Sequence, residues 1–159
     1  MRRMTSEEIN LVLKQVKWAT ICTVSPENRP YAIEATPYLE GGDICFMINP
    51  RGKTWKNLQI NPGVLIKATL ADSFLAWWAG VSFAGTGHFD SDREAIQRGF
   101  QLLGKVIGSD YSAAGRKHAE NAERSPLLRV RIREKTGRCS LAKNESLDGI
   151  INVRITDAR

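Results

Sequence analysis

The sequence predicts a mainly β domain, an antiparallel barrel, closed or partly closed, with helices packed on its outside. Three observations predict this class. Six or seven segments have the β-branched, apolar or alternating composition of strands. Most connections between them are short, which favours antiparallel neighbours. Two longer segments carry apolar residues at helical spacing. The length of 159 residues fits one domain, 1–159.

The first half of the chain is expected to form a helix, four strands and a second, short helix. The first helix runs from Thr5 to Val16, because Thr5-x-x-Glu8 is a capping box and the apolar residues after it share one face. Pro37 predicts an irregularity or an edge in the second strand, because proline cannot donate a ladder hydrogen bond. The strands are expected at Ala19 to Ser25, Tyr31 to Leu39, Ile44 to Ile48 and Val64 to Ala71.

The third quarter of the chain is expected to add one strand and one long helix. Val81 to Asp90 has a strand pattern, and its Gly85 and Gly87 predict a bulge or the close approach of another backbone. Ser91-x-x-Glu94 matches a second capping box and predicts a helix that ends at Gly108. The apolar face of this helix comprises Ile96, Phe100, Leu103 and Ile107.

The last part of the chain is expected to return to the sheet. Residues 112–124 predict a short exposed helix. Leu128, Val130 and Ile132 then alternate with arginines, which predicts a half-buried strand whose arginines face water. Gly137 is expected to turn the chain, and alternation in the tail predicts a final strand. The arginines are Arg129, Arg131 and Arg133, and the alternating tail residues are Ile151, Val153 and Ile155.

The charge balance is basic, with a net charge of +6 and a pI near 9.5. Such a surface attracts phosphate-bearing partners, whether a nucleotide cofactor, a nucleic acid or an acidic membrane. The basic residues are spread along the chain without a polybasic tail, which argues against a nucleic-acid-binding arm. No apolar run is long enough to span a bilayer, and the N-terminus lacks the apolar region of a secretory signal. We expect a cytoplasmic protein that binds neither nucleic acid nor membrane.

The cysteines and histidines do not have metal-site spacing. Cys22, Cys45 and Cys139 are odd in number and far apart, which favours reduced, mostly buried thiols. His88 and His118 are isolated from them and from each other, so no metal site is expected. No Ser/His/Asp or Cys/His arrangement and no pair of carboxylates stands out. Any chemistry would therefore have to come from a cofactor.

The stretch from Phe46 to Val64 has the pattern of a strand, a turn and a short helix. Lys53-Thr54 falls where this helix begins, and the stop is Asn61-Pro62. The start of a helix exposes unpaired N–H groups and the positive end of the dipole, so an adjacent ammonium and hydroxyl make a plausible phosphate cradle. Two alternatives stay open from the residues alone. Lys53 can be an ordinary solvated lysine, and Thr54 can simply cap the helix.

In this order of elements the chain resembles the pyridoxamine 5′-phosphate oxidase-like family of FMN-binding split barrels, from about Glu7 to about Ser140. The family pattern is a small residue, two basic or hydroxyl residues, then Asn/Gln-Leu and Asn-Pro-x-Val. Weaker support comes from the strand that begins Arg29-Pro30-Tyr31 and from Ala84-Gly85-Thr86-Gly87. The matching residues here are Gly52-Lys53-Thr54, Asn57-Leu58 and Asn61-Pro62-Gly63-Val64.

The resemblance implies a split barrel of six to seven antiparallel strands with two or three flanking helices. It places the barrel core at about 7–140 and leaves 141–159 as a C-terminal extension. It also implies a homodimer that holds two FMN molecules in grooves between the subunits. The expected activity is that of a flavoprotein oxidoreductase acting on a small molecule.

Carried over by position, the resemblance assigns cofactor contacts to three segments. Lys53 and Thr54, next to Gly52, would contact the FMN phosphate. The end of the third strand would line the ribityl chain and ring, and the second strand would offer backbone groups to the ring edge. The third-strand residues are Met47, Ile48 and Asn49, and the second-strand residues are Glu34, Ala35 and Thr36.

Two departures from the family pattern argue against the vitamin oxidase activity itself. Oxidase members carry two adjacent basic residues where this chain has Lys53-Thr54, so one charge is missing. They also end in a Trp-x-Arg-Leu-type motif, and this chain has no tryptophan after Trp78. FMN binding is therefore expected with a different substrate.

The adjacent Trp77 and Trp78 have two interpretations. One indole can wall the flavin or substrate pocket of the partner subunit, or the pair can form a hydrophobic patch at a dimer interface. His88 can serve as a proton donor near the flavin or be an ordinary surface histidine.

Three functional hypotheses remain. The first is an FMN-dependent oxidoreductase whose acceptor is a nitro compound, a quinone or a similar heterocycle. The second is a non-enzymatic flavin or haem carrier of the same fold, although neither histidine lies in a convincing haem-ligand context. The third, a barrel that binds single-stranded nucleic acid, is disfavoured because the aromatic residues do not alternate with basic ones along one strand face.

Overall fold

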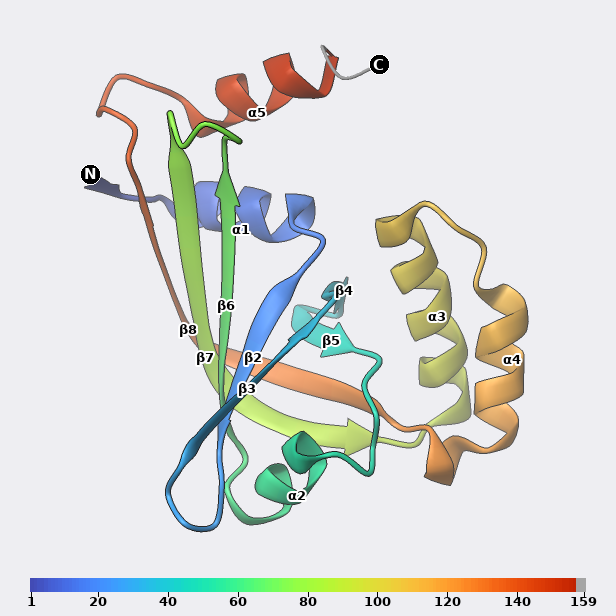
Figure 1. Ribbon diagram of the computed structural model, residues 1–159. Coiled ribbons are helices and arrows are strands. Elements are labelled where there is room, and N and C mark those ends of the chain that lie inside the picture. The colour runs from blue at the N-terminus through green and yellow to red at the C-terminus, as the bar shows by residue number, and fades with distance from the viewer. Residues whose placement is uncertain (157–159) are drawn as a thin grey trace.

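The computed structural model describes residues 1–156. Within these residues the chain forms eight strands, five helices and one 3₁₀ turn (Figure 1). The strands are β1 (Arg2–Arg3), β2 (Ala19–Val24), β3 (Pro30–Ala35), β4 (Tyr38–Glu40), β5 (Asp43–Phe46), β6 (Gly63–Ala71), β7 (Trp78–Asp90) and β8 (Leu127–Cys139). The helical segments are α1 (Ser6–Gln15), α2 (Lys53–Ile60), α3 (Arg93–Ile107), α4 (Ser112–Glu120), η1 (Ala122–Arg124) and α5 (Leu147–Thr156).

All eight strands belong to one antiparallel sheet with the order β3-β2-β6-β7-β8-β5-β4, and β1 pairs with β8. β3 and β4 are joined by only Thr36 and Pro37, yet they lie at opposite ends of this order. The sheet therefore curls so that its two edges approach each other without pairing, which is a split barrel. The predicted fold class is confirmed.

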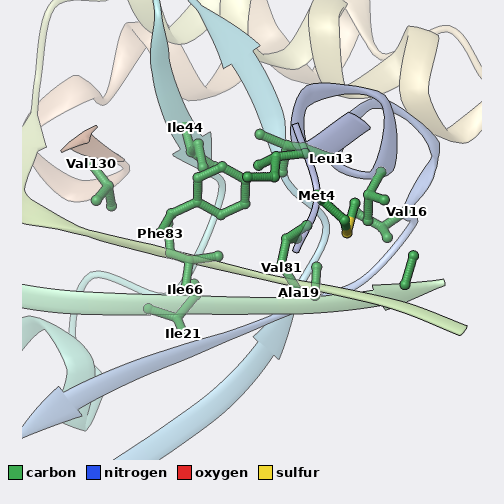
Figure 2. Packing of buried hydrophobic residues seen from close by; sticks show 14 of the residues in the cluster. Met4, Leu13, Val16, Ala19, Ile21, Ile44, Ile66, Val81, Phe83 and Val130 are labelled. Carbon is green, nitrogen blue, oxygen red and sulfur yellow. The ribbon is translucent and has the colours of Figure 1, made fainter. Parts of the chain in front are cut away.

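The barrel interior is a single apolar core that also includes one face of α1. Figure 2 shows Leu13 of α1, Ile44 of β5 and Phe83 of β7 pointing toward one another. A smaller cluster, containing Tyr38 and Ile96, lies beneath α3 and α4. Because α3 packs on β4 and β8 and α4 packs on α3 at the side of the barrel (Figure 1), the two helices extend the core away from its axis.

The first capping box is confirmed, and so is the glycine prediction at Gly85, whereas a Cβ on Gly87 would meet only side chains. The Thr5 hydroxyl accepts from the Glu8 N–H at 3.3 Å, and the Glu8 carboxylate accepts from the Thr5 N–H at 2.9 Å. The β7–β8 register shifts between Ala84 and Gly85, and a Cβ on Gly85 would overlap the carbonyl oxygen of Arg131. The bulge and the close backbone approach therefore occur at the same residue.

The predicted strand from Tyr31 to Leu39 is divided. β3 ends at Ala35 and β4 begins at Tyr38, so Pro37 lies in the break, as its missing N–H predicted. This division, together with the two-residue β1, accounts for the count of eight strands where six to seven were expected. The helices likewise exceed the expected two or three, partly because α5 forms in the tail.

Two predictions for the third quarter of the chain and for Gly137 are wrong. The second capping box is not formed, because α3 is capped by Asp92, whose carboxylate accepts from the Ala95 N–H at 2.7 Å. The chain does not turn at Gly137, since β8 continues to Cys139. A Cβ at Gly137 would lie 2.7 Å from a side-chain carbon of Ile9, so this glycine admits α1 against the strand.

The tail is a helix and not the predicted final strand. Leu147 and Ile151 are four residues apart in α5, and both are buried in the main core, near α1. Four-residue spacing places both side chains on one face of the helix, toward the core. The alternation of Ile151 with the residues after it was too short to distinguish the two periods.

Arg129 also differs from its prediction as a water-facing side chain. It is 15% exposed, and its guanidinium lies 2.7 Å from a Glu40 oxygen, 3.5 Å from Asp90 and 3.6 Å from Asp43. Arg98 of α3 binds the other Glu40 oxygen at 2.9 Å. The group joins β8 to β4, β5, β7 and α3.

The Glu40 carboxyl responds to this environment. Partial burial acts to raise its pKa, but the hydrogen bonds from Arg98 and Arg129 outweigh burial, and the pKa lies below its ordinary value. A carboxyl with a lowered pKa in the folded state stabilises the fold at neutral pH. That contribution is lost as the pH falls through the lowered pKa.

We expect Arg129→Ala to lower the free energy of unfolding by about 3 kcal/mol at pH 7, because three partly buried carboxylates lose their shared partner. In acid the difference from the wild-type protein should shrink, because the carboxylates become neutral. Denaturant unfolding at several pH values measures both effects. Arg131→Ala, on the same strand but exposed, is the control and should change stability by less than about 0.5 kcal/mol. Equal effects of the two variants would contradict the structural role of Arg129.

Candidate functional site

The strand, turn and short helix predicted around Lys53 form as the sequence indicated. β5 ends at Phe46, a turn follows, and α2 begins at Lys53. The turn is fixed by Asn49, whose side-chain oxygen accepts from the Arg51 N–H at 2.9 Å and whose carbonyl accepts from the Gly52 N–H at 3.2 Å. The strand β5 is therefore connected to the start of α2 by a single short turn.

The first turn of α2 has no side-chain cap. Its N-cap residue is Gly52, and Thr54 lies inside the helix with 3% exposure. The alternative in which Thr54 caps the helix is therefore wrong. The N–H groups of the first turn stay available to an anion, at the positive end of the helix dipole.

Lys53 connects this helix start to β3. Its side chain is exposed, and its Nζ atom lies over the ring of Tyr31, 5.6 Å from the ring centroid. A cation over an aromatic face is stabilised by about 0.5–1 kcal/mol at exposed sites. The contact brings Lys53 to β3, the strand that also carries Glu34 and Ala35. Tyr31 was not identified as a site residue from the sequence, although it begins the strand that supported the family resemblance.

β3 offers an unpaired backbone edge. It is the terminal strand of the sheet order, with β2 as its only neighbour, so its outer N–H and C=O groups have no strand to pair with. Glu34 directs its carboxylate to the Thr20 hydroxyl, which donates to it at 2.6 Å, and Ala35 is buried. Thr36 lies just beyond the end of the strand.

Met47, Ile48 and Asn49 line a pocket of about 250 Å³ beside α3 and α4. The opposite wall includes Phe100 and His118, which the sequence did not associate with this segment. Their rings stack with centroids 4.8 Å apart, and the His118 Nδ1 lies 3.0 Å from the Ser125 hydroxyl. The imidazole is thereby held in one orientation at the pocket wall.

The other aromatic and histidine candidates lie elsewhere. Trp77 is buried in the main core with its indole N–H unpaired, whereas Trp78 is half-exposed and lines a separate groove of about 810 Å³ along β7 and β8. The two adjacent tryptophans therefore occupy different environments. His88 is exposed on β7 and lines none of the described pockets.

Asn57 and Leu58 of the sequence motif hold α2 in place. The Asn57 side chain is buried and donates to the Thr23 hydroxyl of β2 at 2.9 Å, while Leu58 packs in the main core. This part of the motif thus has a structural role, because it fixes the orientation of the helix whose start carries Lys53.

The sequence of residues 5–139 matches the family model of pyridoxamine 5′-phosphate oxidase. Over this range the strands, the cradle and the motif around Asn57 are those described above. The chain belongs to the pyridoxamine 5′-phosphate oxidase-like split-barrel family. Among curated proteins no match was found.

Solved structures share the fold at low sequence identity. A FAD-binding protein from Mesorhizobium loti is 16% identical with a TM-score of 0.67, covering 88% of this chain and 98% of its own. A FAD- and haem-binding protein from Mycobacterium smegmatis is 15% identical with a TM-score of 0.70, covering 96% and 80%. A protein from Bacteroides thetaiotaomicron, provisionally assigned to 5-nitroimidazole antibiotic resistance, is 16% identical with a TM-score of 0.71, covering 87% and 86%. At these identities the likeness establishes the fold alone.

Nowhere in residues 1–156 do three or more His, Cys, Asp or Glu side chains gather as a metal site would require. None of the helices in the same range is long and apolar enough to cross a membrane.

We expect Asn57→Ala to lower the free energy of unfolding by about 2 kcal/mol, because the Thr23 hydroxyl is left buried without a partner. Thermal or denaturant unfolding measures this loss. Gln59→Ala, an exposed change on the same helix, is the control and should leave stability nearly unchanged. If both variants were equally stable, the bond between α2 and β2 would not be what fixes the helix.

Proposed function

We propose that this protein binds the FMN moiety of a flavin at the junction of β5 and α2 and passes electrons through it to a small-molecule acceptor. The observation that carries the proposal is the position of Lys53, at an uncapped helix start and above Tyr31 of the open-edged strand β3. Flavin-binding relatives of the same fold support the cofactor class.

Different residues would bind different parts of the flavin. Lys53 and the free N–H groups of the first turn of α2 suit the phosphate, since both present positive charge to it. Met47, Ile48 and Asn49 would line the ribityl chain and ring. The outer N–H groups of β3 near Glu34 to Thr36 would donate to the polar edge of the ring. A bound flavin supplies hydride and single-electron chemistry, and donors at that edge stabilise the negative charge that reduction places there.

We further propose that the active form is a homodimer with the cofactor between the subunits. The loop between β6 and β7 supports this. Phe74 is 91% exposed and Leu75 is 73% exposed, and adjacent apolar side chains at such exposure are typical of an interaction surface. Thr54, which stands where the oxidase pattern has a second basic residue, supports a substrate other than pyridoxamine 5′-phosphate.

An absorbance spectrum tests the cofactor assignment. We expect the protein to be yellow as purified, or to become so after mixing with FMN and removal of the excess, and a reductant should bleach the colour. A protein that stays colourless and takes up no flavin would overturn the proposal. A haem-type spectrum would instead favour the haem-binding alternative.

Turnover separates the enzyme from the carrier of the same fold. The flavin-loaded protein is mixed with reduced nicotinamide donors and with nitro, quinone and heterocyclic acceptors. Steady acceptor reduction supports the oxidoreductase. Tight flavin binding without turnover across this panel supports a carrier.

Lys53→Ala tests the cradle directly. We expect its FMN affinity to fall by about tenfold or more, because a charge-assisted contact to the phosphate is lost, while thermal stability stays close to wild type. Calorimetric titration measures the affinity. Lys143→Ala, which removes an exposed lysine outside the described pockets, should bind FMN normally. Unchanged affinity in Lys53→Ala would mean that the phosphate binds elsewhere.

A further inference from the structure

A second pocket, of about 300 Å³, borders the first turn of α2 on the side of η1. It is strongly basic. Arg51 and Lys56 contribute from the α2 side and Arg124 from η1, against a single carboxylate, Glu123. These residues are far apart in the sequence, so no sequence pattern indicated the pocket.

The three cations of this pocket have no carboxylate partner. Among the side chains described for residues 1–151, the ion pairs within 4.0 Å that Arg2, Arg98 and Arg129 form do not involve the pocket. Even Glu123 is not paired with its neighbours. Unpaired like charges gathered around one concavity repel each other, and an anion of more than one charge would relieve that repulsion.

The pocket continues from the predicted phosphate position. Lys53 and Lys56 are three residues apart on α2, so their side chains occupy neighbouring positions on the helix surface. Arg51 precedes Lys53 by two residues. Positive charge therefore runs without a gap from the start of α2 into the pocket.

Trp55 supplies a flat apolar surface in the same pocket. It is half-buried and belongs to neither core cluster, so its indole is not fully used in holding the barrel together. An indole beside cationic groups is suited to stack with a purine whose phosphate is neutralised nearby.

We propose that this pocket binds the adenosine phosphate half of FAD, so that the resident flavin is the dinucleotide. The inference rests on the proposed docking of the flavin phosphate at Lys53. FMN would end at that phosphate and leave Arg51, Lys56 and Arg124 without a counter-charge. In FAD the second phosphate extends toward these cations, and the adenine can lie against Trp55.

The test compares FMN and FAD binding to flavin-free protein by calorimetry. We expect FAD to bind about tenfold more tightly than FMN, since one further charge-assisted contact has roughly this effect. Arg124→Ala and Lys56→Ala should each reduce FAD affinity about fivefold or more and leave FMN affinity within about twofold. Lys53→Ala should weaken both ligands.

Arg93→Ala is the matched control, because Arg93 is exposed on α3 and lines no described pocket. It should leave both affinities unchanged. Equal affinity for FMN and FAD would overturn this inference while the proposed flavin function stands. If neither flavin bound, both proposals would fall.

A final arm separates FAD from free nucleotides, which carry the same adenosine phosphate. FMN-loaded protein is titrated with AMP and with a reduced nicotinamide dinucleotide. Arg124-dependent binding of these ligands, without any preference for FAD, would assign the pocket to a free nucleotide and overturn the FAD assignment.

Discussion

The ion-pair group centred on Arg129 is the constraint on which one side of the barrel depends. Arg129 lies on β8 opposite Cys45 of β5 and His88 of β7, and its guanidinium also reaches Glu40 of β4. A half-buried cation surrounded by carboxylates from three strands fixes their relative positions, because each pair is directional and partly shielded from water. β5 is one of these strands, so the group also sets where β5 delivers the chain to α2.

The candidate site is built from parts whose positions have separate causes. α2 is fixed by the bond between Asn57 and Thr23 and by Leu58 in the core. β3 is left with an open edge by the curl of the sheet. α3 and α4 add the wall that carries His118. The proposed cofactor segments thus lie on, or next to, helices and strands that the fold holds in place, which is the condition for a ligand to meet preorganised donors.

Local patterns in the sequence predicted most of the fold, and the failures have physical reasons. The capping box at Thr5 and the break at Pro37 depend on groups close in sequence, and both were predicted. Arg129 was misjudged because alternation in β8 predicts which side faces away from the barrel core, and not whether carboxylates and a helix cover that side. The tail was misjudged because Leu147 and Ile151, four residues apart, share a face in a strand as well as in a helix, so this spacing does not distinguish the two.

In the candidate site, too, features set by residues close in sequence were predictable and features set by distant residues were not. Lys53 at a helix start was predictable from its own neighbourhood, because the strand, turn and helix are consecutive. The walls formed by His118 and Arg124 were not, since both lie more than one element away in the chain and reach the site only when α3, α4 and η1 fold back. A basic residue in a polar stretch carries no signal of which pocket it will border.

The loop that carries Phe74 and Leu75 is already ordered in the single chain. The Asp72 carboxylate accepts from the Phe74 N–H at 2.8 Å, its carbonyl accepts from the Leu75 N–H at 2.9 Å, and Leu75 takes a left-handed backbone conformation with φ of 57°. Little backbone conformational freedom would therefore be lost when the side chains of Phe74 and Leu75 become buried against a partner. Binding of a partner through this loop would therefore be close to rigid-body docking. Little of the favourable binding free energy would be offset by loss of chain entropy.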